Sequence, residues 1–111
     1  MYDVVIAGAS FAGLAVADQL RGRRVLLLDR KGVGTGQTSA CATILRVLQH
    51  WGLTDALLQV HHNLILHTAW NRFDFCSPYP WCTFDYRQFC EALWKRSGAQ
   101  FVRATVQGYD G

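Results

Sequence analysis

The stretch that decides the fold is Val4-Val5-Ile6-Ala7-Gly8-Ala9-Ser10-Phe11-Ala12-Gly13. An apolar run leads into a turn that begins and ends with glycine, and a helix-like run, residues 14–20, follows it. A second apolar run, residues 25–28, then ends at Asp29. Strand, glycine-rich turn, helix, strand and acidic residue, in this order, are typical of a βαβ unit that binds a dinucleotide.

The turn precedes a predicted helix, whose first N–H groups lack partners and whose dipole adds partial positive charge. A pyrophosphate fits such a place. Gly8 permits the tight turn, and Gly13 permits close packing of helix on strand. Ser10 stands where a middle glycine is expected, and its hydroxyl either donates to a phosphate oxygen or holds the ligand slightly away. We therefore expect the phosphates to lie against Gly8, Ser10, Phe11, Ala12 and Gly13.

Asp29 ends the second strand, 21 positions after Gly8, where an acidic residue accepts hydrogen bonds from ribose hydroxyls. The alternative is a strand-end carboxylate paired with Arg30. The segment that follows, residues 30–43, is a loop rich in glycine, serine and threonine. It is long for a simple connection, and such loops are often functional, although a mobile linker is the alternative.

Ser10 also fits part of a nucleophile elbow, which is GxSxG on a strand–turn–helix. The fifth position of that pattern is Ala12 instead of glycine. An elbow also follows several strands, whereas this turn follows the first predicted strand. No histidine lies in a recognisable catalytic motif. A hydrolase is therefore disfavoured, and no catalytic residue is assigned.

Patterns of apolar residues predict an α/β fold with a Rossmann-like parallel sheet. We expect strands over 2–7, 24–29, 62–69, 72–76 and 100–106, and helices over 12–21, over 43–50 and from residue 86. The first strand is expected to be buried on both faces, and Ala12, Ala15 and Val16 are expected to face the sheet. The third and fourth strands form an antiparallel hairpin inserted around residues 62–76. Pro78 and Pro80 are expected to break regular structure.

Composition argues against several classes of protein. Half of the 111 residues are hydrophobic and 17% are charged, which favours one folded domain over disorder. The net charge of +3 and the lack of a dense basic run argue against nucleic-acid binding. The four cysteines contain no CxxC pair, so we expect no metal site. No apolar run approaches the roughly 20 residues of a membrane span, and we expect a cytoplasmic chain with free thiols.

The chain resembles the N-terminal part of FAD-dependent oxidoreductases, most closely the geranylgeranyl reductases and the aromatic-hydroxylase-like flavoprotein monooxygenases. The resemblance rests on the turn from Gly8 to Gly13, on the loop after the second strand, and on Val25-Leu26-Leu27-Leu28-Asp29-Arg30. A second, weaker match resembles a family helix with an arginine near its start: Asp85-Tyr86-Arg87-Gln88-Phe89-Cys90-Glu91-Ala92-Leu93.

The resemblance implies FAD as the cofactor, and NAD(P)H is an option for the electron donor. It implies that Asp29 binds the adenosine ribose. Arg30, Ser39 and Arg87 would complete the polar shell of the cofactor. Val106, on the strand after the helix, would place its backbone against the adenine.

The sequence departs from the family pattern at three positions. Ser10 replaces the middle glycine, Phe11 stands where proline is common, and Asp29 replaces the more usual glutamate. Cys41 matches a flavin-side cysteine of some reductases, and a buried structural thiol is the alternative.

Family members are much longer than this chain, so residues 1–111 are expected to form the N-terminal portion of an FAD-binding domain. The sheet would then be incomplete, and the remainder of the enzyme or a partner chain would complete it. We expect a small-molecule substrate, lipid or aromatic, and a lipid substrate would bring peripheral contact with a membrane. Two alternatives stay open: an NAD-dependent dehydrogenase fragment, and a non-enzymatic truncated module that binds a nucleotide or a partner through its open edge.

Overall fold

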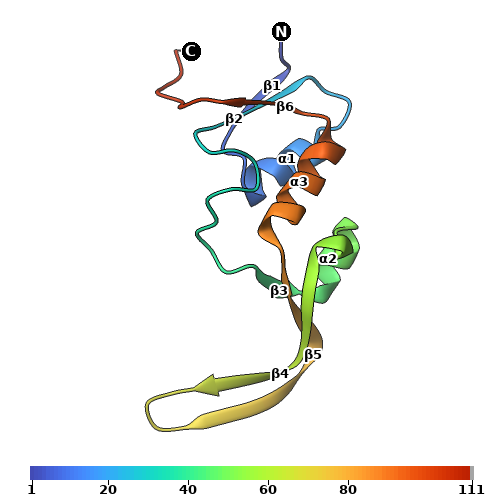
Figure 1. Cartoon of the computed structure of the whole chain (residues 1–111), viewed down its shortest axis with the longest axis vertical. Helices are drawn as coiled ribbons and strands as arrows, with labels where there is room; N and C mark the ends of the chain where they lie inside the picture. The colour runs from blue at the N-terminus through green and yellow to red at the C-terminus, as the bar shows by residue number, and fades with distance from the viewer. Residues whose placement is uncertain (111) are drawn as a thin grey trace. The chain divides into compact units, whose positions relative to one another are not determined.

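The computed structural model describes residues 1–110, which form two compact units (Figure 1). The first unit comprises residues 1–38 and the residues from 86 onward, and the second comprises residues 39–85. The first contains a parallel sheet and the second an antiparallel sheet. The predicted α/β fold with an inserted antiparallel hairpin is confirmed.

The parallel sheet has the strand order β1-β2-β6. Its strands are β1 (Val4–Ala7), β2 (Val25–Asp29) and β6 (Gln100–Arg103). The helices of this unit are α1 (Phe11–Gln19) and α3 (Tyr86–Ser97). Because parallel strands cannot be joined by a tight hairpin, α1 lies between β1 and β2 in the chain, and α3 leads into β6.

Both helices cover the same face of the parallel sheet. Ile6, Leu27 and Phe101 pair side by side in the register and therefore share a face. A Cβ placed on Gly13 of α1 would lie 3.3 Å from Ile6 Cγ2. Trp94 of α3 packs edge-on against Phe101, with ring centroids 5.9 Å apart. Leu27, at the centre of this face, is fully buried.

The expectation that the first strand is buried on both faces is wrong. Burial alternates along β1, and Val5 is 57% exposed. Val102 of β6 is also exposed. The physical reason is that α1 and α3 both pack on the Ile6 side of the sheet.

The buried side of α1 also differs from the prediction. Ala12 and Val16 are exposed, whereas Leu14, Ala17 and Asp18 are buried. Helix α1 packs against α3 as well as against the sheet. Part of its buried side is therefore set by a helix that lies far away in the sequence.

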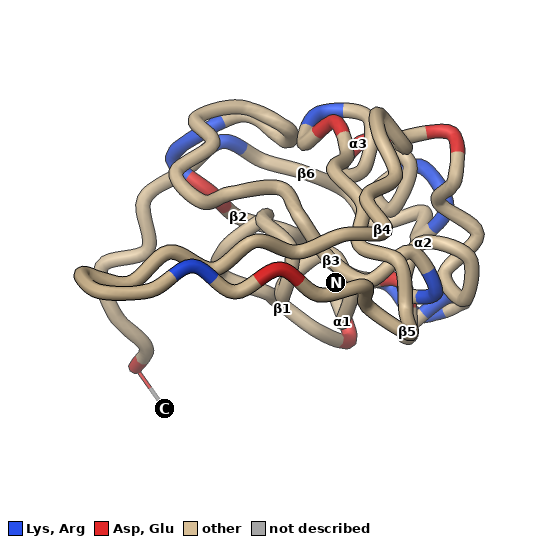
Figure 2. The backbone as a smooth tube through the Cα atoms, turned by 90° about the horizontal axis from the view of Figure 1, so that it is seen from below, with Lys and Arg blue, Asp and Glu red and all other residues tan. Residues whose placement is uncertain are grey.

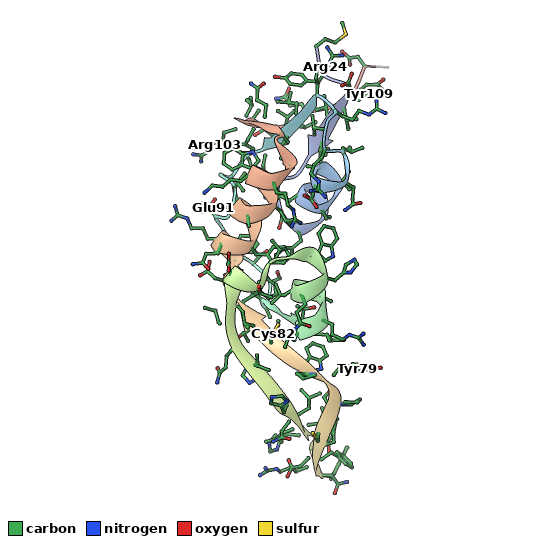
Figure 3. The ribbon with its side chains drawn as sticks, turned by 90° about the vertical axis from the view of Figure 1, so that its right-hand side faces the viewer. Arg24, Tyr79, Cys82, Glu91, Arg103 and Tyr109 are labelled. Atoms are coloured by element: carbon green, nitrogen blue, oxygen red, sulfur yellow. The ribbon has the colours of Figure 1, made fainter. Side chains whose placement is uncertain are left out.

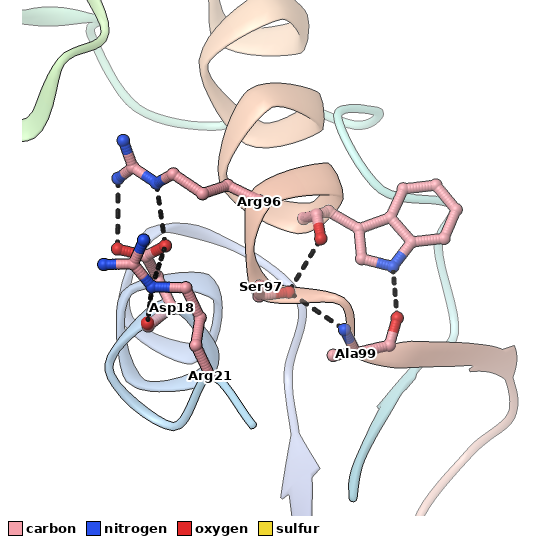
Figure 4. A network of polar contacts seen from close by, with 6 residues as sticks. Asp18, Arg21, Arg96, Ser97 and Ala99 are labelled. Atoms are coloured by element: carbon pink, nitrogen blue, oxygen red, sulfur yellow. Dashed lines mark hydrogen bonds and ion pairs between the residues drawn. The ribbon is translucent and has the colours of Figure 1, made fainter. Parts of the chain in front are cut away.

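A partly buried ion pair joins α1 to α3 (Figure 4). Asp18 is 1% exposed. Arg96 Nε donates to Asp18 Oδ1 at 2.8 Å, and Arg96 Nη2 donates to Oδ2 at 3.0 Å. Arg21 Nε donates to the Asp18 backbone carbonyl at 2.9 Å. The two-bond geometry fixes the two helices in one register, because a fork of parallel hydrogen bonds is directional.

The second unit has the strand order β3-β5-β4. Its elements are β3 (Ala42–Ile44), α2 (Leu45–Trp51), a 3₁₀ turn (Thr54–Ala56), β4 (Leu57–His67) and β5 (Arg72–Phe84). β4 begins five residues earlier and β5 ends eight residues later than the predicted hairpin strands, whereas β4 ends two residues earlier, at His67. The start of the helix predicted over 43–50 belongs to β3, whose pairing with β5 is a long-range contact that local periodicity does not reveal.

The prediction that Pro78 and Pro80 break regular structure is wrong, because both lie within β5. The pairing of β4 with β5 shifts between His61 and Asn63. In the described ladder, residues 77–80 lie in this shift and pair with no β4 residue. The prolines therefore remove no ladder hydrogen bond, which is the usual condition for proline in a strand.

The core of the second unit is small. Cys82 of β5 (Figure 3) and Leu48 of α2 are fully buried. Burial raises the pKa of the Cys82 thiol and outweighs the hydrogen bond with Thr43, which lowers it. Tyr79, also labelled in Figure 3, lies under the Arg46 guanidinium, whose carbon is 5.4 Å from the ring centroid.

Charge is dispersed along the described chain. Figure 2 shows the Lys and Arg residues on several elements, with Asp and Glu interspersed among them. Within residues 1–110, no helix has the length and apolar character needed to cross a membrane.

Candidate nucleotide-binding site

The candidate site lies in the first unit, at the carboxyl ends of β1 and β2. Open α/β sheets bind ligands at this edge. Gly8 N donates to Leu28 O at 2.7 Å, which continues the strand pairing into the turn. Ser10 is the N-cap of α1, and its carbonyl accepts the first helical hydrogen bond from Leu14 N at 2.9 Å. The predicted strand, turn and helix are therefore all in place.

Two glycines of the turn are required by its geometry. Gly8 has φ +108°, a conformation that residues with a Cβ rarely adopt. A Cβ on Gly13 would lie 1.8 Å from the Gly8 carbonyl oxygen and 2.9 Å from its carbon. These are backbone atoms that no side-chain movement can clear. The turn thus brings its own backbone against the helix.

Asp29 ties the turn to the loop after β2. Ala9 N donates to Asp29 Oδ2 at 2.8 Å, and Lys31 N donates to Oδ1 at 2.9 Å. Burial raises the pKa of this carboxyl. The backbone N–H groups of Ala9, Lys31 and Arg30, together with the Arg30 charge, lower it by more, so the pKa lies below its ordinary value of 3.8. Asp29 is therefore ionised at neutral pH. Each oxygen retains lone-pair capacity for a further donor such as a hydroxyl.

Two open pockets meet at Asp29 and Arg30. The first, of about 240 Å³, is bordered by the turn, the loop and the start of α3, with Ala9, Ser10, Lys31, Thr35, Thr38 and Tyr86 in its wall. The second, of about 260 Å³, is bordered by the carboxyl ends of the strands, with Gly8, Leu28, Ala104, Thr105 and Val106 in its wall. The shared carboxylate therefore has a hydroxyl-rich, cationic pocket on one side and a pocket of mainly backbone and apolar groups on the other.

The loop after β2 follows a defined path along the start of α3. Thr35 donates to the Gly32 carbonyl from its backbone N at 3.2 Å and from Oγ1 at 2.6 Å. Gly34 has φ +73°, and a Cβ on it would lie 3.1 Å from Arg87 Cα. Close approach of loop and helix thus requires glycine at this position.

Tyr86 is a site residue that the sequence does not predict. Its hydroxyl lies 2.9 Å from Ser10 Oγ, and its ring packs edge-on against Phe11 with centroids 5.2 Å apart. Burial raises the pKa of Tyr86, so its phenol is protonated at neutral pH. Tyr86 adjoins Arg87 in the second matching motif, but no sequence pattern shows that residues 10 and 86 are neighbours.

The other predicted residues have different positions. Arg30 borders both pockets. Arg87 lies on α3, and its Nε donates to Glu91 Oε1 at 2.9 Å. Val106 borders the second pocket, but the prediction that it lies on a strand is wrong. Strand β6 ends at Arg103, whose register partner Asp29 is the last residue of β2, and Ala104 N still donates to the Asp29 carbonyl at 2.9 Å.

Two predicted residues belong to the second unit. Ser39 begins that unit, so its contact with a cofactor stays a prediction. Cys41 is half-buried, and burial together with the nearby Asp85 carboxylate raises the pKa of its thiol. Among residues 1–110, no three His, Cys, Asp or Glu side chains gather where they would hold a metal ion.

No protein-family model matches the sequence, and a search of curated proteins finds no match. Solved structures do match. PqsL of P. aeruginosa in complex with 2-aminobenzoylacetate has a TM-score of 0.71 and 18% identity over 91% of this chain. The flavin-dependent brominase Bmp2 has a TM-score of 0.69 and 17% identity over 92%. The myxobacterial chondrochloren halogenase CndH is described as a variant of FAD-dependent halogenases. It has a TM-score of 0.65 and 22% identity over 90% of this chain.

These comparisons define the fold. The chain has the fold of the matching part of flavin-dependent enzymes, as the sequence predicts. It spans 33% of the PqsL chain, 29% of Bmp2 and 28% of CndH.

Proposed function

We propose that the first unit binds FAD and that the chain is part of a flavin-dependent oxidoreductase. The observation that carries the proposal is the ionised Asp29 carboxylate, which holds the glycine turn through Ala9 N and lies between the two pockets. A dinucleotide needs this order of features: an anion site, a ribose acceptor and a place for a base.

The residues present fit the ADP half of FAD. The pocket beside Ser10 and Lys31 suits the pyrophosphate, because the α1 dipole and the lysine charge favour an anion there. Asp29 suits the ribose hydroxyls. The pocket beside Val106 suits the adenine. When bound, FAD supplies the redox chemistry, and this chain binds and orients the cofactor.

Within the flavin enzymes, we propose an enzyme of the hydroxylase and halogenase type in preference to a geranylgeranyl reductase. The support is that flavin-dependent halogenases recur among the similar folds. The substrate would be a small aromatic molecule, since the PqsL structure holds 2-aminobenzoylacetate. Reduction of the flavin by NAD(P)H stays a prediction from the family resemblance.

A thermal-shift panel tests cofactor choice. FAD should raise the melting temperature of the purified chain, and riboflavin should not, because riboflavin lacks the ADP half that the site fits. Asp29→Ala should weaken the FAD effect. The matched control is Asp3→Ala, which removes an exposed carboxylate from the same unit and should leave the FAD effect unchanged. Stabilisation by NADH and not by FAD would support the NAD-dependent alternative instead, and no shift with either ligand would support the non-enzymatic module.

A further inference from the structure

Ser10 is an N-cap serine that does not cap its helix. Serine at this position normally accepts a hydrogen bond from a backbone N–H two or three residues later, here Ala12 or Gly13. The Ser10 side chain makes no such bond to α1. Its hydroxyl lies instead 2.9 Å from the hydroxyl of Tyr86, on another helix.

We propose that Tyr86 is a positioning residue that holds the Ser10 hydroxyl away from the N-terminus of α1. The N–H groups of Ala12 and Gly13 then stay available to a phosphate oxygen. A capping serine would occupy one of the donors that a phosphate needs. The pair explains how serine is accommodated where the dinucleotide pattern expects glycine. The ligand in this inference rests on the proposed function.

The surroundings of Tyr86 hold its hydroxyl in place. Its ring packs edge-on against Phe11, and Phe11 packs edge-on against Phe89, with centroids 5.2 and 5.3 Å apart. Tyr86 begins α3, and Gly34 of the loop packs against the next residue, Arg87. A protonated phenol both donates and accepts, so it can pair with the Ser10 hydroxyl in either orientation.

The test is a pair of variants with two readouts. Tyr86→Phe frees Ser10 to cap α1. FAD affinity should then fall about fivefold, which is the change in binding constant that corresponds to the free energy of one N-cap hydrogen bond. Amide hydrogen exchange at Ala12 or Gly13 should slow in the same variant without ligand. Adding Ser10→Ala to Tyr86→Phe removes the cap, so exchange should return to the wild-type rate. FAD affinity should recover relative to Tyr86→Phe alone.

The control is Tyr109→Phe, which removes a hydroxyl from a tyrosine that is 92% exposed and should change neither readout. Unchanged exchange and affinity in Tyr86→Phe would overturn the proposal. Weaker binding with a lower melting temperature, not restored by Ser10→Ala, would show that Tyr86 only supports the packing. A wild-type chain that fails to bind FAD would overturn the proposed function. Because hydrogen exchange is measured without ligand, the exchange result would still decide whether Tyr86 positions Ser10.

Discussion

Asp29 combines a structural role with its candidate binding role. From the sequence alone, it is expected at a solvent-facing strand end, where its removal would leave the fold intact. In the structure, both carboxylate oxygens accept backbone N–H groups, one from the turn and one from the loop. Replacing Asp29 should therefore loosen the glycine turn as well as remove a ribose acceptor.

Asp29→Asn should lower the free energy of unfolding by about 1–2 kcal/mol at pH 7, because the amide NH₂ would meet a backbone N–H as a second donor. The folded-state pKa of Asp29 lies below its ordinary value of 3.8, so the carboxylate stabilises the fold above that pH. The stability difference between wild type and variant should shrink as the pH falls through the lowered pKa. Urea unfolding from pH 7 to pH 3 measures it.

The comparison with wild type isolates Asp29 from other carboxylates. Asp3 also has a lowered pKa, caused mainly by its hydrogen bonds with Arg24. Because Asp3 is present in both proteins, its effect cancels in the difference. A difference that stays constant down to pH 3 would contradict the role assigned to Asp29.

Alanine substitutions at Gly13 and Gly22 should distinguish the stability cost of a steric clash from the cost of an unfavourable backbone conformation. Gly13→Ala should destabilise the fold by about 3 kcal/mol or more, because its Cβ would overlap the Gly8 carbonyl. Gly22 has φ +87° but open space around it, so Gly22→Ala should cost only about 1 kcal/mol. Denaturant unfolding of both variants measures the contrast, and equal costs would be inconsistent with the close turn described above.

At the scale of elements, local signals identify the parts of the fold that local chemistry determines. The glycine turn, the parallel strands, the hairpin and the start of α3 follow from glycine spacing and apolar periodicity. Strand β3 and the extension of β5 do not, because their pairing joins distant segments. The buried side of α1, with Leu14, Ala17 and Asp18, is also missed. Asp18 pairs with Arg96 of α3, a helix that sequence periodicity cannot place.

Removing either partner of the Asp18–Arg96 pair should destabilise the fold, but the two losses should be unequal. Arg96→Met leaves a carboxylate that is 2% exposed with only the longer ion pair to Arg21 Nε, at 3.6 Å, and should cost about 3 kcal/mol. Asp18→Leu should cost less, because Arg96 is 30% exposed and can turn to water. The double variant should recover much of the loss, since a buried pair can be replaced by apolar side chains. Unfolding free energies that simply add in the double variant would show that the pair is not coupled.

At the scale of the whole molecule, the site combines residues that adjoin in sequence with residues that do not. The turn and Asp29 are found from one βαβ segment, so the sequence predicts them directly. Tyr86 and the stretch from Ala104 to Val106 come to the same edge only through the crossover that ends in β6. The matching solved structures share the fold, and this chain spans 29% of Bmp2 and 33% of PqsL.

The most direct test of FAD binding at this edge is an NMR titration of the ¹⁵N-labelled chain with FAD. The predicted result is a set of amide shifts at three places: the turn from Gly8 to Gly13, residues 29–31 and residues 104–106. Riboflavin, without the ADP half, should leave these amides unmoved. No shifts at these three places, in a chain that keeps its folded spectrum, would contradict the account.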